Sequence, residues 1–139
     1  MTAGPFLLVT MGTLLLAVGV GRRSPRAWLA FTVIGGSAAL GAALLVLFGS
    51  ADWEWRSAFR IGGEPLHLRL DGVSALFLAL VGVLGSAGAV YAREYWPDHH
   101  YPASAPRGRA WWSALLVSMV LVLTASNGLH FLIAWESFA

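Results

Sequence analysis

The sequence predicts an all-α membrane protein: about four complete transmembrane helices, the start of a fifth, and a small surface β-hairpin between the second and third helices. The 139 residues are 58% hydrophobic and 12% charged, about half the charged share of an average soluble domain. Long stretches carry almost no charge, and a polar segment between them alternates with the strand period of two. A soluble domain of this size could not bury so much apolar surface.

The first two predicted helices cover about residues 4–20 and 27–48. The first is slightly short for a span, since its apolar run rises roughly 24 Å against a hydrocarbon core of ~30 Å. Arg22 and Arg23 follow this run instead of preceding it, so we interpret it as a retained helix and not as a secretory signal. Small residues dominate Gly35–Ala43 of the second helix, which predicts close helix packing in lipid.

Residues 49–71 form an extracytoplasmic hairpin loop in this interpretation. Apolar and polar side chains alternate on both sides of Gly62-Gly63, a pattern typical of two strands joined by a tight turn. Trp53 and Trp55 suit the membrane interface, where an indole lies between headgroups and tails. Asp71 is expected to cap the next helix.

The third and fourth predicted helices cover about residues 72–92 and 110–126, and the whole chain, 1–139, is expected to be one transmembrane region. The loops 21–26 and 93–110 share one side of the membrane and contain six arginines, whereas the loop 49–71 contains three. This imbalance favours cytoplasmic placement of the two basic loops, with the N-terminus outside. We therefore expect a multi-pass protein of the cell's inner (cytoplasmic) membrane.

Glu136 is the only formally charged residue after Ala110, and its depth decides its chemistry. If one helix runs through this stretch, Glu136 emerges among the opposite headgroups. If the chain turns at Asn127-Gly128, a strong turn dipeptide, an incomplete helix covers 129–139 and Glu136 lies ~12 Å deep. A carboxylate there is costly unless paired, hydrated or protonated, which makes it a proton-transfer candidate. The composition leaves both placements open.

Other chemistry has little support in the sequence. His130 is a weaker proton-transfer candidate, because it lies on another face of the helix from Glu136 and a relay would need water; the alternative is a solvated interfacial imidazole. His99-His100 beside Asp98 resembles a metal site only weakly, since adjacent histidines in a loop chelate one ion poorly. Cysteine chemistry is excluded by the absence of cysteine. We expect no catalytic residue, metal, cofactor or nucleic-acid partner in this chain.

Two segments resemble a known family. Leu66–Phe77 contains Asp-Gly-Val-Ser ahead of an apolar helix, and Ser126–Glu136 is an apolar run that ends in Trp-Glu. Together, at this spacing, they resemble the antiporter-like proton-translocating subunits. This family includes the large antiporter-like subunits of complex I, hydrogenase-4 component B, formate hydrogenlyase subunit 3 and the multisubunit Na+/H+ antiporters. The wording of Phe131–Glu136 slightly favours the hydrogenase-4 and formate hydrogenlyase branch.

The resemblance implies proton or cation translocation driven by redox chemistry in neighbouring subunits of a hydrogenase or NADH:quinone oxidoreductase type. In that family Glu136 would be the intramembrane carboxylate of the fifth helix, paired with a lysine on the seventh. Members have about fourteen helices, whereas this chain has no lysine and stops near the glutamate. We therefore expect an N-terminal fragment that does not pump alone and that assembles with other membrane subunits. The alternative is a small non-transporting membrane scaffold or assembly subunit.

Overall fold

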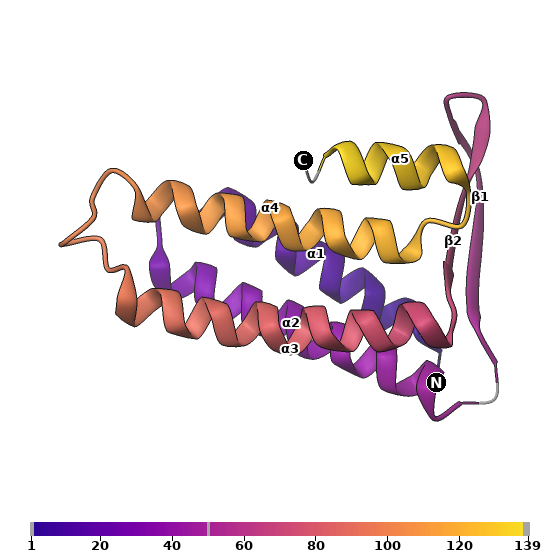
Figure 1. Ribbon diagram of the computed structural model, residues 1–139, viewed down its shortest axis with the longest axis horizontal. Coiled ribbons are helices and arrows are strands. Elements are labelled where there is room, and N and C mark those ends of the chain that lie inside the picture. The colour runs from indigo at the N-terminus through magenta and orange to yellow at the C-terminus, as the bar shows by residue number, and fades with distance from the viewer. Residues whose placement is uncertain (1, 50, 138–139) are drawn as a thin grey trace.

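The computed structural model describes residues 2–49 and 51–137. Four helices lie side by side along its long axis, and a β-hairpin stands across one end (Figure 1). A fifth helix turns back beside the fourth. The helices are α1 (Gly4–Val20), α2 (Pro25–Leu47), α3 (Gly72–Tyr95), α4 (Ala105–Thr124) and α5 (Gly128–Glu136). We call the end with the hairpin and the N-terminus the hairpin end, and the end with residues 21–24 and 96–104 the loop end.

Local capping sets the start of two helices. Ser24 precedes α2, and its Oγ accepts a hydrogen bond from the backbone N–H of Ala27 at 3.3 Å, with Pro25 in the first turn. Asp71 caps α3 as predicted, because its Oδ1 accepts from the backbone N–H of Ser74 at 2.8 Å. Both caps satisfy donors that a helix leaves free in its first turn.

The small residues of α2 bring α2 and α3 close together, as their composition predicted. A Cβ added at Gly82 would lie 2.6 Å from the backbone oxygen of Gly36, and one added at Gly36 would lie 2.6 Å from that of Gly82. Only glycine permits backbones to approach so closely at this crossing. Around it, side chains of α1 to α4 form the main core, with Leu14, Leu78 and Val120 among its buried members.

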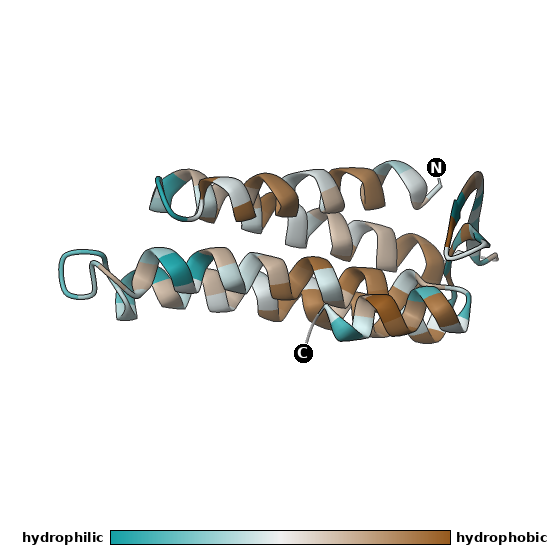
Figure 2. Cartoon of the chain, turned by 90° about the horizontal axis from the view of Figure 1, so that it is seen from above, coloured by the Kyte–Doolittle hydropathy of each residue, from teal (hydrophilic) through white to brown (hydrophobic). Residues whose placement is uncertain are grey.

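Two helices, α2 and α3, have the length and hydropathy of membrane spans, with 23 and 24 residues. The prediction of four complete spans is therefore supported for two of them. α1 is apolar but has 17 residues, and α4 begins with a polar turn that contains Arg107 and Arg109. The hydropathy colouring shows the hydrophilic residues gathered toward the two ends of the bundle (Figure 2).

The predicted hairpin is present. Strands β1 (Trp53–Ile61) and β2 (Glu64–Leu70) pair antiparallel, with a register irregularity between Arg56 and Arg60. Gly62 and Gly63 form the turn with φ of 62° and 87°, a backbone conformation that favours glycine and suits a two-residue hairpin.

The helix boundaries differ from the predicted ones mainly around α4. This helix begins at Ala105, five residues earlier than predicted, with Pro106 in its first turn, a position that proline favours. It ends at Thr124, since Ala125 is extended, with ψ of 122°. The alternative prediction, in which one continuous helix runs from about residue 110 through Glu136, is therefore wrong. α5 starts at Gly128, and residues 138–139 of the predicted fifth helix lie outside the described residues.

Candidate functional site

The turn between α4 and α5 sends the chain back along the bundle. Asn127 caps α5, and its Oδ1 accepts a hydrogen bond from the backbone N–H of His130 at 2.8 Å. Ser126 ties the turn to the hairpin, because its backbone N–H and its Oγ both donate to the carbonyl oxygen of His67, at 3.2 and 3.1 Å. Leu129 lies against the hairpin turn at Gly62. The start of α5 is thus held by its own cap and by the hairpin.

Two measures place Glu136 well inside the bundle's length. It is eight residues after Gly128 along α5, a helical rise of ~12 Å. Next to it, the carbonyl oxygen of Ser137 accepts a hydrogen bond from Ser118 Oγ at 3.3 Å. Ser118 lies six residues before the end of α4, a rise of ~9 Å. Glu136 therefore lies beside the C-terminal half of α4, about one third of the helix length from its end.

The Glu136 side chain faces away from the helices that the structure describes. Glu136 is exposed, and no hydrogen bond or ion pair joins its carboxylate to a residue within 2–49 or 51–137. Leu132 and Ile133 are exposed on the same helix, whereas Ala134 is buried. A carboxylate at this depth on an outward apolar surface needs a proton, water or a cation from elsewhere.

His130 occupies another face of α5 from Glu136, one that is packed inside the protein. It is 6% exposed, so the solvated imidazole considered above is wrong. Its Nδ1 lies 2.7 Å from Asn127 Nδ2, which donates to it because Asn127 Oδ1 already accepts from the backbone. This leaves the ring proton on Nε2, which is buried without a hydrogen-bond partner among the described residues. The structure does not bring His130 and Glu136 together.

A second polar cluster, at the loop end, was not singled out from the sequence. Arg109 is 7% exposed. Its Nε donates to the carbonyl oxygen of Gly21 at 2.8 Å, its Nη2 donates to Asp98 Oδ2 at 3.0 Å, and its Nη1 donates to Asp98 Oδ1. The guanidinium carbon lies 6.0 Å from the ring centre of Trp28. The charge of Arg109 predicted only a place in a loop. The spacing of Arg109, Trp112 and Ser113, which puts them on one helix face, is the sequence signal for a buried role.

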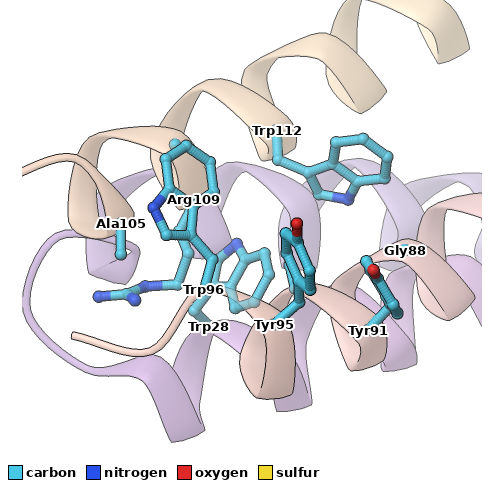
Figure 3. A pocket seen from close by; sticks show the side chains of 10 residues that line it. Trp28, Gly88, Tyr91, Tyr95, Trp96, Ala105, Arg109 and Trp112 are labelled. Atoms are coloured by element: carbon cyan, nitrogen blue, oxygen red, sulfur yellow. The ribbon is translucent and has the colours of Figure 1, made fainter. Parts of the chain in front are cut away.

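An apolar cavity of about 270 Å³ adjoins this cluster, between α2, α3 and α4 (Figure 3). Its walls include three indoles whose N–H groups are all bonded inside the protein. Trp28 Nε1 donates to Ser113 Oγ at 2.9 Å, Trp96 Nε1 to Ser104 Oγ at 3.2 Å, and Trp112 Nε1 to the Gly85 carbonyl oxygen at 3.2 Å.

The hairpin carries the exposed ion pairs. Glu54 accepts from Arg56 Nε at 2.8 Å and lies 2.5 Å from His67 Nε2. The hydrogen bond from Arg56, followed by that with His67, holds the pKa of Glu54 below its ordinary value. Arg69 donates to Asp52 at 2.7 Å, which raises the pKa of Arg69. These pairs are solvated, so they set local geometry more than stability.

The histidines of the loop do not form a metal centre with other described residues. The rings of His99 and His100 lie 4.2 Å apart, but no group of three or more histidine or acidic side chains in the described part of the chain could hold an ion.

Comparison with known proteins relates the chain to an antiporter subunit. No family model matches it. It is 29% identical over 89 residues to a putative antiporter subunit mnhA2 of Staphylococcus saprophyticus; the match covers 64% of this chain and 10% of that protein. The chain thus spans a small part of the relative's length. The relative is an antiporter subunit, so the slight preference for the hydrogenase-4 branch gains no support. Together with the apolar helices α2 and α3, the match indicates a membrane protein similar to antiporter-like subunits.

Proposed function

We propose that this chain forms part of a cation-translocating membrane subunit in which Glu136 is the proton-handling carboxylate. The observation that carries the proposal is the chain reversal at residues 125–127, which returns α5 along α4 so that Glu136 lies beside the C-terminal half of α4, ~9 Å from its end. The similarity to an antiporter subunit supports the same function class.

Aromatic residues at both ends of the bundle support four membrane crossings. The loop end holds all three tyrosines and four of the seven tryptophans, and the hairpin holds two more tryptophans. Tyrosine and tryptophan favour the two membrane interfaces, where the ring contacts both headgroups and tails. The apolar part of α4, residues 110–124, follows its polar first turn and rises ~22 Å, which a locally thinned bilayer can match. We include α1 and α4 as spans on this ground.

The arginine distribution supports an orientation. Six arginines lie at the loop end and three on the hairpin, which favours a cytoplasmic loop end. The hairpin, the N-terminus and the start of α5 then face outward, and Glu136 is approached from the outer side of a cytoplasmic membrane.

Glu136 requires a partner that the described residues do not supply. A carboxylate in the membrane interior is stabilised as the anion by a nearby ammonium or guanidinium group, and withdrawal of that cation favours protonation. A partner cation on a further helix, moving relative to α5, would therefore make Glu136 take up and release a proton. The sequence motifs suggest that redox chemistry in neighbouring hydrogenase-type or NADH:quinone oxidoreductase-type subunits drives this movement.

The depth of Glu136 can be tested by cysteine labelling, since the natural chain has no cysteine. Gly128→Cys has open space around its Cβ, and Ala58→Cys lies exposed on the hairpin. We expect a membrane-impermeant maleimide to label both positions from the outer side of intact cells and to leave Glu136→Cys unlabelled. Labelling of position 136 as fast as position 128, or from the opposite side, would overturn the placement of Glu136 within the membrane.

The function itself is tested in the complete subunit by following acidification of everted vesicles. Glu136→Gln should abolish cation-dependent proton movement, and Glu136→Asp should retain part of it. Glu64→Gln is the matched control, because Glu64 is exposed at the start of β2. Full transport in Glu136→Gln would refute the assignment and would favour the scaffold alternative.

A further inference from the structure

We infer that the cavity at the loop end binds one acyl chain of an anionic phospholipid, whose headgroup lies among the arginines of that end. The inference rests on the membrane location given in the proposed function. It does not depend on the role of Glu136.

The cavity accepts an apolar occupant, because its polar groups are already used. The indole N–H groups of Trp28, Trp96 and Trp112 donate to Ser113, Ser104 and Gly85, so their ring faces and not their donors line the space. Arg109 is engaged by the Gly21 carbonyl and both oxygens of Asp98. A polar ligand would find few free partners here and would lose its hydration. A hydrocarbon chain loses nothing on entry.

Two glycines shape the aromatic walls. A Cβ at Gly88 would lie 2.6 Å from the ring of Trp112, and a Cβ at Gly108 would lie 2.8 Å from the ring of Trp96. Each indole therefore packs directly against a helix backbone at a position where any side chain would displace the ring. The cavity's 270 Å³ is comparable with small ligand cavities.

The cavity opens at the surface of α3. Tyr91 and Tyr95 line it with their rings stacked 5.2 Å apart, and they are 63% and 69% exposed. Figure 3 shows Tyr95 beside Trp28, and Tyr91 next to Gly88. Exposed tyrosines at the end of an apolar helix mark the level of the lipid headgroups, so an acyl chain reaches the cavity from the adjoining leaflet.

Charge selects the kind of lipid. The loop end contains six arginines and two carboxylates, Glu94 and Asp98, which leaves four net positive charges. Arg22 and Arg23 directly follow Gly21, whose carbonyl oxygen accepts a hydrogen bond from Arg109 Nε. They therefore lie next to the polar cluster of Arg109 and Asp98 that adjoins the cavity. Arg22 and Arg23 are both exposed, and neither forms an ion pair with another described residue. An anionic headgroup supplies the missing countercharge, whereas a zwitterionic lipid or a neutral quinone does not.

The test uses the tryptophans as reporters. The chain is placed in phosphatidylcholine vesicles that contain a minor fraction of dibrominated lipid, either phosphatidylglycerol or phosphatidylcholine. Bromine in the acyl chain quenches an indole that it contacts. We expect the brominated phosphatidylglycerol to quench more at equal mole fraction, with an association constant raised about five-fold for each arginine that contacts the headgroup.

Three variants locate the effect. Ala92→Phe fills the cavity, since Ala92 lines it, and should remove the lipid-specific quenching. Arg22→Gln with Arg23→Gln should abolish only the preference for phosphatidylglycerol, and these exposed positions leave the fold intact. Arg56→Gln with Arg60→Gln on the hairpin is the matched control and should keep the preference.

Each outcome is decisive. Equal quenching by the two brominated lipids shows an inserted chain without an anionic-lipid site and overturns this inference alone. A preference that survives in the Arg22, Arg23 variant also overturns it. Absence of quenching by either lipid shows that the chain does not enter the bilayer, which overturns the membrane location on which the proposed function depends.

Discussion

Removal of Asp98 should destabilise the protein more than removal of Arg109, although the two residues form one ion pair. The side chain of Arg109 is 7% exposed and that of Asp98 is 41% exposed. Asp98→Ala therefore leaves a charged guanidinium buried without its countercharge. Arg109→Met removes the buried charge and leaves Asp98 free to be solvated.

The burial values set the size of this difference. Loss of one partner from a buried pair costs about 3–5 kcal/mol when the remaining charge stays uncompensated. We expect the lower end, about 3 kcal/mol, for Asp98→Ala, since Arg109 keeps its hydrogen bond to the Gly21 carbonyl oxygen. Arg109→Met should cost about 1–2 kcal/mol, because it loses that bond and the contact with Trp28 while methionine fills part of the space. The double variant should resemble Arg109→Met alone.

Unfolding in mixed detergent micelles, followed by tryptophan fluorescence and helical circular dichroism, measures all four proteins of this double-mutant cycle. The expected coupling energy between the two positions is about 3 kcal/mol, equal to the cost of Asp98→Ala, because the double variant resembles Arg109→Met. Ser57→Ala on the hairpin is a control remote from the loop end. Equal losses for the two single variants, or losses that simply add in the double variant, would refute the buried-charge reasoning.

Two further predictions concern the helices. Gly82→Ala should destabilise the bundle by about 1–3 kcal/mol, because its Cβ would lie 2.6 Å from the backbone oxygen of Gly36, which cannot move without shifting α2. Gly12→Ala is the control and should not destabilise it, since there is open space around that Cβ. Equal stability of the two variants in detergent would contradict the close crossing of α2 and α3. Asp71→Ala should cost about 1 kcal/mol through loss of the cap, whereas Asp71→Asn keeps an acceptor. The Ser74 backbone N–H holds the pKa of Asp71 below 3.8, so the charged cap contributes fully above that pH and is lost as pH falls through the lowered value. Stability measured against pH should show this loss in the natural chain and not in Asp71→Asn, and an identical profile in both would exclude the charged cap.

The helices, the hairpin turn and the helix caps could be predicted because each depends on residues that are close together in the sequence. Charge-free runs specify helices, and Gly62-Gly63 provides the positive φ that a two-residue turn requires. Asp71 and Asn127 cap helices through donors three residues ahead. The start of α4 differs from the prediction, because the charges of Arg107 and Arg109 indicate a loop. In the folded bundle, Asp98 neutralises Arg109, and the helix begins at Ala105.

The sequence by itself determined the charge-free helical runs and the hairpin turn at Gly62-Gly63. It offered a turn at Asn127-Gly128, and the structure established that the chain reverses there. Only the tertiary structure decided which way the side chains face: His130 inward, Glu136 outward, and Arg109 into the loop-end cluster. The physical reason is that these helices are apolar on every side, so their periodicity does not identify the packed face. That face is chosen by partners far along the chain, such as Gly21 for Arg109 and Ser118 for the end of α5.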